Sequence, residues 1–417
     1  MLPEDWHYST VENCADLLTG HAFASDQYVD AADASIRLLR GDNVTPGQLR
    51  WTDAKLWTIP YGKALSRYEM QNGDIVIAMD RPIINSGLKI SIVGERDLPC
   101  LLVQRVARIR AKPSADQAYL SHVLGSRHFV EHLKGQKTET AVPHISPKDI
   151  RSYKFATPSK AEQQKIARVL SVWDEAIIAT ESVLANLRHQ KLGLLRKLFK
   201  RRRNGHPAPA SWTHIDLDQV FERVTRKNVP GNANVLTISG EHGLISQREY
   251  FNKSVASANL AGYTLLLQGE FAYNKSYSAG YPMGAIKPLT RYDAGVVSSL
   301  YVCFRFRDGI EADCDFFRHY FEAGLLNDEL TGIAQEGARN HGLLNVGVGD
   351  FFKLRLHIPP VEKQRRIASI LNAAESEERM VSEQIRLLRE EKQALMQQLL
   401  TGRRRVHLPE PAKAVSA

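Results

Sequence analysis

One phrase occurs twice in this chain, and no other sequence feature restricts its fold as strongly. Residues 161–170 read AEQQKIARVL, and residues 362–371 read EKQRRIASIL. The copies align without a gap at an offset of 201 residues, the separation of Ile166 from Ile367. Identities in this register include Pro158/Pro359, Gln163/Gln364, Leu187/Leu388 and Lys191/Lys392. A duplication of this length predicts two similar modules in one chain.

Each copy carries the heptad pattern of a coiled-coil helix, because its seam positions step alternately by four and three residues. Each helix is expected to span about 33 residues, or about 50 Å. Glu378 and Lys392 are polar breaks in the second seam. The apolar seam residues are Ile166, Leu170, Trp173, Ile177, Leu184, Leu187, Leu194 and Leu198 in the first copy, and Ile367, Leu371, Val381, Ile385, Leu388, Leu395 and Leu399 in the second.

Helix start and stop signals accompany the seam. Ser159 and Glu162 form the S-x-x-E pattern of a capping box at the first helix, whereas Lys363 replaces the glutamate at the second and makes its box doubtful. Gly402 follows the second helix as a C-terminal cap.

The segments that precede the two helices also correspond. DWHYSTVENC near the start of the chain resembles SWTHIDLDQV, and NGDIVIAM resembles QGEFAYNK. The chain therefore has the order A-B-A′-B′. The predicted parts are a first domain at 1–157, a first helix at 158–203, a second domain at 204–357, a second helix at 358–405 and a disordered tail at 406–417.

Connectivity predicts how the parts are arranged. The second domain joins the end of the first helix to the start of the second, and domain termini usually lie close together, so the helices should run antiparallel. The predicted fold class is α+β, with two pseudo-two-fold-related domains held apart by a long antiparallel two-helix coiled coil. Duplex DNA has a matching dyad, and two-fold proteins read half-sites about 34 Å apart. Because the two domains differ in sequence, their half-sites should differ too.

Charge and composition limit the partners. The chain has a net charge of +9, and residues 158–203 alone hold 11 basic and 4 acidic side chains. This basic excess favours an anionic partner. The sequence lacks a membrane-length apolar run, and its acidic start is unlike a signal peptide, so we expect a cytoplasmic protein. Four cysteines without a C-x-x-C pair indicate reduced thiols and no metal site.

The arrangement resembles the specificity (S) subunit of type I restriction-modification systems. The resemblance covers essentially the whole chain and rests on the paired helix openings at Pro158 and Pro359, the aromatic-led starts at Trp6 and Trp212, and the GD and GE strands that begin at Gly73 and Gly269. It implies two target-recognition domains on double-stranded DNA, a helical spacer, two docked methyltransferase (M) subunits, and restriction (R) subunits. Under this resemblance S-adenosylmethionine, ATP and Mg belong to the partners, and this chain needs no cofactor.

The residues independently favour a non-catalytic chain. The sequence has no G-x-x-x-x-G-K-[ST] phosphate loop, no suitably placed Gly-rich nucleotide loop and no N-P-P-[YF] or D-P-P-[YF] motif. HFVEH at 128–132 matches the H-x-x-E-H zinc peptidase pattern. The resemblance places an ordinary amphipathic helix there, and we reject the zinc interpretation.

Candidate DNA-binding residues are polar side chains in loops beside glycine, where a backbone can approach DNA closely. An ordinary strand and polar turn would use the same residue types. The candidates are Lys137, Thr138, His144, Arg81 and Lys89 in the first domain, and Asn274, Lys275, Ser276, Tyr277, Arg339, Asn340 and His341 in the second.

Two other functions fit the same features. An autonomous duplex-DNA-binding regulator would bind a two-part site without partners. In a coiled-coil scaffold without DNA affinity, the basic helix end, Arg188–Arg203, would be a solvated face. Its cations would only interact favourably with the helix dipole. Duplex binding distinguishes the scaffold from the other two.

Overall fold

A computed structural model describes residues 2–30, 34–135, 144–199, 212–240, 242–251, 259–278, 280–336 and 344–407. The chain forms two compact units. Unit 1 is Met1–Ser182 with Glu383–Ala417, and unit 2 is Val183–Ser382. Each unit thus contains a sheet domain and a part of both long helices, whereas the sequence-based division treated the helices as separate segments.

The sheet domain of unit 1 is built around a four-stranded antiparallel sheet, covered by the apolar faces of its helices. The sheet order is β10 (Ile90–Ile92), β7 (Ile75–Ala78), β12 (Val106–Ala111), β2 (Ala15–Thr19). A second sheet contains β11 (Cys100–Leu102), β3 (Ser35–Leu39) and β6 (Leu56–Thr58). The paired strands are β1 (His7–Thr10) with β13 (Lys154–Thr157), β4 (Val44–Thr45) with β5 (Gln48–Leu49), and β8 (Ile83–Ile84) with β9 (Gly87–Leu88). The helices are α1 (Val11–Cys14), α2 (Gln117–Leu124), α3 (Arg127–Gly135) and α4 (Pro147–Arg151).

Unit 2 has its own four-stranded sheet, in the order β20 (Ala285–Pro288), β19 (Phe271–Asn274), β22 (Val302–Phe306), β15 (Phe221–Arg223). The paired strands are β14 (Thr213–Asp216) with β25 (Arg355–Ile358), β16 (Leu236–Ser239) with β17 (Gly243–Ser246), β18 (Thr264–Leu267) with β21 (Ala294–Val297), and β23 (Gln335–Glu336) with β24 (Leu344–Asn345). The helices are α6 (Leu217–Val220), α7 (Gln247–Phe251), α8 (Cys314–Glu322), α9 (Asn327–Ile333) and α10 (Val348–Phe352).

The two sheet domains share one topology. The strand order β10-β7-β12-β2 in unit 1 matches β20-β19-β22-β15 in unit 2, strand by strand along the chain. In both units, a short antiparallel pair joins the first strand of the domain to the strand before the long helix, β1 with β13 and β14 with β25. The similar phrases NGDIVIAM and QGEFAYNK form β7 and β19 with the turns before them. The internal similarity of the sequence therefore extends to the fold.

The turn before β7 and β19 explains the glycine–acid pair in both copies. Gly73 has φ 88° and Gly269 has φ 85°, a left-handed conformation that glycine adopts at little cost. The next side chain closes the turn, because Asp74 Oδ2 accepts from Gln71 N at 2.8 Å and Glu270 Oε2 accepts from Leu267 N at 2.9 Å. Each buried carboxylate is then neutralised by an arginine, Arg110 on Asp74 and Arg226 on Glu270.

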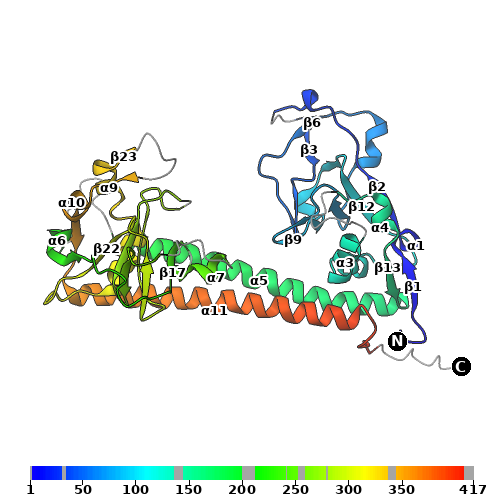
Figure 1. Cartoon of the computed structure of the whole chain (residues 1–417). Helices are drawn as coiled ribbons and strands as arrows, with labels where there is room; N and C mark the ends of the chain where they lie inside the picture. The colour runs from blue at the N-terminus through cyan, green and yellow to red at the C-terminus, as the bar shows by residue number, and fades with distance from the viewer. Residues whose placement is uncertain are drawn as a thin grey trace, which may run out of the picture. The chain divides into compact units, whose positions relative to one another are not determined.

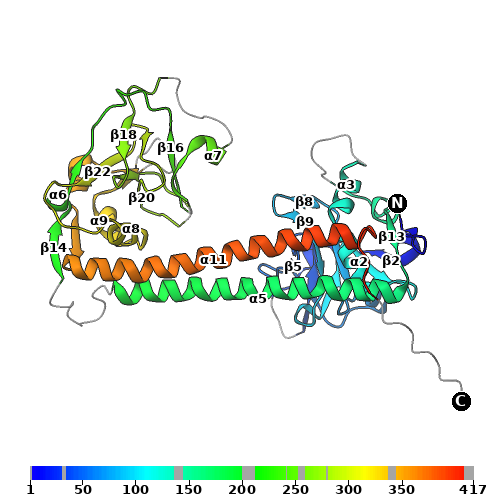
Figure 2. The ribbon, with the colours of Figure 1, turned by 90° about the horizontal axis from the view of Figure 1, so that it is seen from below.

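Two helices of 39 residues each follow the sheet domains, α5 (Lys160–Leu198) and α11 (Val361–Leu399). They lie side by side in Figures 1 and 2. Within unit 1, Lys392 bonds Asp174 and Arg389 bonds Glu181. Residue numbers thus increase along α5 in the direction in which they decrease along α11, so the two helices are antiparallel. Both helices are longer than the seam alone predicted, because each starts six residues before the first seam residue.

The predicted seam residues face the helix interface. Ile166, Leu170, Ile367 and Leu371 are fully enclosed, with at most 2% of their surface exposed. Every other apolar seam residue is buried or half-buried in its unit. The helix pair is therefore held by the apolar stripe that the heptad pattern indicates.

A buried glutamine explains why the helix openings share a Pro-x-x-x-x-Gln spacing. Gln163 Nε2 donates to Pro158 O at 3.0 Å, and its Oε1 accepts from Asp116 N at 2.9 Å. In unit 2, Gln364 Nε2 donates to Pro359 O at 2.9 Å, and its Oε1 accepts from Asp313 N at 3.1 Å. Asp116 and Asp313 are the N-caps of α2 and α8. The glutamine therefore ties the start of the long helix to a helix of the sheet domain.

The predicted capping box at Ser159 is only half right. Ser159 Oγ accepts from Glu162 N at 3.3 Å, as expected. The Glu162 carboxylate instead accepts from Trp6 Nε1 at 3.1 Å and from Arg405 at 2.6 and 2.8 Å. Because Glu162 is only 1% exposed, hydrogen bonds from an indole and a guanidinium stabilise its carboxylate more than a bond from one backbone amide would.

Unit 2 departs from this arrangement at the aligned position. Lys363 cannot accept a hydrogen bond, and its ammonium lies 5.8 Å from the centre of the Trp212 ring as a cation–π contact. The buried Trp212 Nε1 has no partner within the described residues. The single exchange of Glu162 for Lys363 therefore changes how the first strand of each domain is attached to its helix.

The chain leaves the second helix at the predicted cap. Gly402 has φ 73°, and its N–H donates to Leu399 O at 3.3 Å, so α11 ends before the basic residues that the sequence placed in it, Arg403–Arg405. Of the predicted tail, residues 408–417 lie outside the described residues, as do 200–211 after α5. Among the described helices, none is long and apolar enough to cross a membrane.

Candidate nucleic-acid interface

The same backbone contact brings the two candidate segments of each domain together. After β7, Met79 O accepts from Ile145 N at 2.9 Å; after β19, Lys275 O accepts from Leu344 N at 2.9 Å. The residues immediately before these contacts are 136–143 and 337–343, which lie outside the described residues. Lys137, Thr138, Arg339, Asn340 and His341 belong to those segments. After the segment, Ile145 and Leu344 thus lie beside the end of the equivalent strand in each domain.

In unit 1 this strand end carries a cluster of cations around one carboxylate. Arg105 Nη1 lies 2.5 Å from Asp80 Oδ2, and His144 Nδ1 lies 2.6 Å from Asp80 Oδ1. Arg105 and His144 are about two-thirds exposed, whereas Asp80 is one-third exposed. Partial burial raises the pKa of the Asp80 carboxyl, but the hydrogen bonds from Arg105 and His144 outweigh it and hold that pKa below its usual range.

Two further cations complete the cluster. Arg81 is exposed, and Lys89, which lies between β9 and β10, is half-buried. Burial lowers the pKa of the Lys89 ammonium, while Asp42 and Asp80 act in the opposite direction. Thus the described candidates of the first domain, Arg81, Lys89 and His144, lie around Asp80.

Arg105 was not predicted from the sequence. It stands in the turn between β11 and β12, far along the chain from the other cluster members, and nothing in the local sequence marks it. Arg105 has φ 64° and Arg81 has φ 44°, left-handed conformations that are uncommon for residues other than glycine. Such conformations occur more often at functional sites, which agrees with the position of both residues in one exposed cluster.

In unit 2 the four described candidates differ in what they can offer a ligand. Asn274 Oδ1 accepts from Ser276 N at 3.2 Å, which closes the turn after β19. The Lys275 ammonium points back to Val346 O at 3.5 Å. Tyr277 is 63% exposed, whereas Asn274, Lys275 and Ser276 are half-buried. Tyr277 therefore presents the most accessible polar and aromatic surface of this segment.

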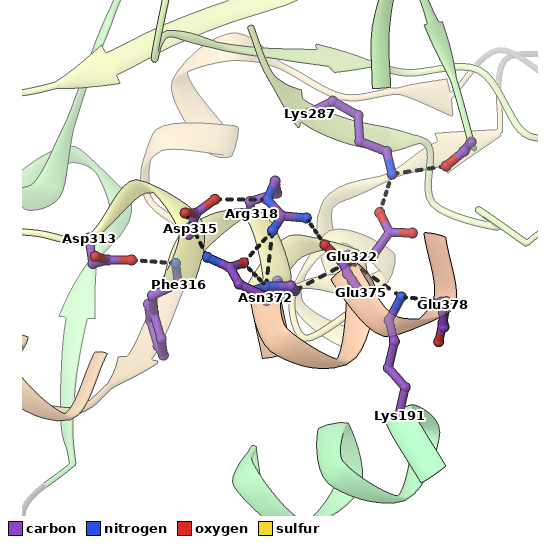
Figure 3. Close-up of polar contacts among 12 residues, drawn as sticks. Lys191, Lys287, Asp313, Asp315, Phe316, Arg318, Glu322, Asn372, Glu375 and Glu378 are labelled. Carbon is purple, nitrogen blue, oxygen red and sulfur yellow. Dashed lines mark hydrogen bonds and ion pairs between the residues drawn. The ribbon is translucent and has the colours of Figure 1, made fainter. Parts of the chain in front are cut away.

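The turn that carries Tyr277 is held at its other end by a buried lysine. Lys287 on β20 is 7% exposed and donates to Tyr281 Oη at 2.9 Å and to Gly240 O at 3.2 Å. Its ammonium also bonds Glu322 of α8, as Figure 3 shows. Glu322 in turn accepts from Tyr281 Oη at 2.6 Å. Burial, with the hydrogen bond and the charge of Glu322, raises the pKa of the Tyr281 phenol well above its usual range.

Close backbone contact also fixes this turn. Gly284 has φ 78°, and a Cβ atom there would lie 2.3 Å from Asn274 O. Glycine is therefore required at 284, because any side chain would displace the strand end that carries the candidate residues.

The residues of the rejected zinc pattern have other partners. His132 Nε2 lies 2.9 Å from Asp149 O, and Glu131 accepts from Arg127 at 2.7 Å on the same helix. His128 is exposed. Over the residues that the structure describes, no group of three or more His, Cys, Asp or Glu side chains is placed to hold a metal ion.

Comparison with known proteins identifies a family for the first part of the chain. The model of the type I restriction modification DNA specificity domain matches residues 3–187, which include the sheet domain of unit 1 and most of α5. Residues 3–187 belong to this specificity domain family. The Asp80 cluster therefore lies within a specificity domain.

One curated relative is the specificity subunit of the type I restriction enzyme EcoAI from Escherichia coli. It is 34% identical to this chain over 177 residues, which are 42% of this chain and 29% of the relative. The matched region thus spans less than a third of the length of that protein.

Two solved structures resemble nearly the whole chain. One comes from work described as the structural basis underlying complex assembly and conformational transition of the type I R-M system; it has a TM-score of 0.57 and 16% identity, covering 96% of this chain and 99% of that chain. The other is the S subunit of a type I restriction-modification system from M. genitalium, with a TM-score of 0.55, 14% identity and 96% coverage of both chains. At these identities the likeness is one of fold, and it extends beyond the specificity domain at residues 3–187.

Proposed function

We propose that this chain is the DNA-recognition subunit of a type I restriction-modification complex, and that each unit reads one half of a two-part target. The observation that carries the proposal is the duplication. A specificity domain occupies residues 3–187, and unit 2 repeats its strand order and its loop-to-strand contact. Two domains of one topology in one chain suit two half-sites.

The two half-sites should differ in sequence. Unit 1 offers an Asp80 cluster with exposed arginine and histidine, whereas unit 2 offers an exposed tyrosine beside a turn closed by Asn274. Arginine pairs well with guanine and with phosphate, and an exposed ring can stack on a base. The same fold therefore presents different chemistry to the two halves of the target.

The chemistry of the complex would belong to its partners. Two methyltransferase subunits would bring S-adenosylmethionine, and restriction subunits would bring ATP and Mg. In this proposal the long antiparallel helix pair is a spacer that separates two pseudo-two-fold-related recognition domains and provides the docking surface for those subunits. This chain itself would be non-catalytic.

The test is to co-express the chain with the methyltransferase subunit that the proposed complex requires and to map modified adenines in the host DNA. A motif in two parts with a fixed gap is the expected result. A folded complex that binds duplex DNA but methylates no adenine would instead favour an autonomous regulator. The lack of any duplex binding would leave only the scaffold.

If α5 and α11 form the spacer, shortening both should shorten the gap in the target. Deleting 180–186 and 381–387 removes one heptad from each helix and keeps the seam in phase. Each helix becomes about 10 Å shorter, which corresponds to about 3 base pairs. Methylome mapping should show a gap reduced by that amount. A correctly folded deletion variant that keeps the original gap would rule out a ruler.

Arg105→Ala should weaken binding of the assembled methyltransferase complex to its target duplex and make that binding less sensitive to salt. If Arg105 contacts one phosphate, the slope of log K against log salt should fall by about 0.9. Fluorescence anisotropy between 50 and 200 mM salt would measure both quantities. Arg127→Ala is the matched control, because Arg127 is an exposed arginine of the same unit whose partner, Glu131, lies on its own helix. Equal slopes for the two variants would remove Arg105 from the interface.

A further inference from the structure

A buried histidine meets a carboxylate and a lysine where the sheet domain of unit 1 rests on the helix pair. His122 on α2 is 7% exposed, and its Nδ1 lies 3.9 Å from Asp174 Oδ2 on α5. Lys392 on α11 bonds the same carboxylate, and the Lys392 side chain is only 17% exposed. Three helices therefore meet at Asp174.

Unit 2 contains the same meeting of three helices. His319 on α8 is 1% exposed, and its Nδ1 lies 3.8 Å from Glu375 Oε1 on α11. Lys191 of α5 lies 3.3 Å from Glu375 Oε1 and 3.5 Å from Glu378 Oε2. Figure 3 shows Lys191 extending from α5 toward these two carboxylates.

Unit 2 adds further hydrogen bonds around the same carboxylate. Arg318 Nη1 donates to Glu375 at 2.7 Å, and Arg318 Nη2 donates to Asn372 Oδ1 at 2.7 Å. Asn372 Nδ2 donates to Asp315 Oδ2 at 2.9 Å. The additional hydrogen bonds of Arg318, Asn372 and Asp315 thus belong to unit 2. A lysine, a carboxylate and a histidine are common to both units.

These three residue types occupy equivalent positions. Asp174 and Glu375 stand 201 residues apart, as do Lys191 and Lys392, and this is the offset of the repeat. His122 and His319 each lie six residues after the aspartate that caps α2 or α8. The chain therefore contains two copies of one lysine–carboxylate–histidine joint: His122, Asp174 and Lys392 in unit 1, and His319, Glu375 and Lys191 in unit 2.

Charge makes the joint depend on helix direction. In the antiparallel pair, each lysine faces the carboxylate of the other helix. A parallel, in-register pair would bring residues 201 positions apart to the same level, so that Lys191 would meet Lys392 and Asp174 would meet Glu375. Like charges that face each other across a helix interface are destabilising, and a polar seam residue is a known means of selecting register.

We propose that the two lysine–carboxylate–histidine joints select the antiparallel register of the helix pair and hold each sheet domain on it. They are thus positioning residues for the gap between the half-sites, a consequence that rests on the proposed function. The lysine of one long helix forms an ion pair with the carboxylate of the other long helix. The histidine places the domain helix, α2 or α8, within 4 Å of the same carboxylate.

A charge exchange in the full chain tests the joint without DNA. Lys392→Glu places two acids together at the unit 1 joint and should lower its unfolding midpoint by about 5 °C. Asp174→Lys alone should act similarly, whereas the double variant restores opposite charges and should recover at least half of the loss. Arg389→Glu is the matched control, because Arg389 also pairs across the helices, with Glu181, but the Arg389 side chain is 63% exposed whereas that of Lys392 is 17% exposed. It should shift the midpoint by no more than about 1 °C.

Calorimetry, with hydrogen exchange of the α2 amides, provides the readout. Faster exchange in α2 for Lys392→Glu but not for Arg389→Glu would support the proposal. Equal midpoints for those two variants, or a double variant no better than its parents, would overturn it.

The spacing consequence is tested separately in the methyltransferase complex. A changed or broadened gap for Lys392→Glu, restored in the double variant, supports the positioning role. An unchanged gap with full methylation refutes that role and leaves the proposed function intact. If wild-type complex methylates nothing, the proposed function fails, and calorimetry still decides the joint.

Discussion

Leucine in place of Gln163 should lower the free energy of unfolding of unit 1 by about 3 kcal/mol. The side chain is 1% exposed and satisfies two backbone groups, Asp116 N and Pro158 O. Leucine has a similar size but cannot form hydrogen bonds, so both groups would remain buried and unpaired. Gln364→Leu should cost unit 2 a similar amount, because Asp313 N and Pro359 O would lose the same partner.

Chemical denaturation followed by circular dichroism would measure both losses. Gln164→Leu and Gln384→Leu are matched controls, since each replaces an exposed glutamine of the same helix. We expect the controls to stay within about 0.5 kcal/mol of the wild-type chain. If Gln163→Leu and Gln164→Leu were equally mild, the glutamine would not be the link between the helix start and the sheet domain.

Unit 1 should lose about 3 kcal/mol of stability as the pH falls from 6.5 to about 4, because of His122. Burial and, second, the charge of Lys392 together lower the pKa of its imidazole to about 4, although Asp174 and Asp116 partly oppose them. The unfolded chain binds a proton near pH 6.5, whereas the folded unit resists protonation until about pH 4. The stabilisation is therefore complete above pH 6.5 and disappears across that window.

His122→Gln removes the titrating group and should flatten this dependence, even if it lowers stability at pH 7. His128→Gln, on the exposed face of α3, should leave the slope unchanged. Urea denaturation at half-unit pH intervals would separate the two variants. A slope retained in His122→Gln would assign the acid sensitivity to other groups.

The repeated sequence predicted the helix pair and its direction well, for physical reasons. Heptad spacing reports directly which helix face is apolar, and the buried Ile166 and Leu371 lie on that face. Connectivity gave the antiparallel direction. The length of the helices was predicted less well, because the first turn of α5 lies before Ile166, where the seam pattern has not yet begun.

The polar partners were much less predictable. The local pattern assigned Glu162 to a capping box, but the indole of Trp6 and the guanidinium of Arg405 compete for it, and both are distant in sequence. Arg105 reaches Asp80 only because two strands and a left-handed turn bring them together. Asn274 was chosen for its hydrogen-bonding groups, yet it uses its oxygen to close its own turn.

The sequence nominated candidate residues for an interface but did not predict which of them are exposed. The candidates were chosen as polar residues in loops beside glycine, and of these His144 and Tyr277 are exposed. Which side chain faces outward depends on hydrogen bonds across the fold. Lys275 and Tyr277 are two residues apart, but one points to Val346 O and the other to solvent.

The glycine–acid turns and the buried glutamines use backbone groups and helix caps, and none of their hydrogen bonds involves the described candidate residues Arg81, His144 or Tyr277. Substitutions at those three positions should consequently leave the glycine–acid turns and the glutamine links intact. In a domain built this way, single mutations at the candidate residues can change the ligand preference while the thermal stability stays the same. The architecture thus separates robustness from evolvability, and the two halves of the chain can diverge independently.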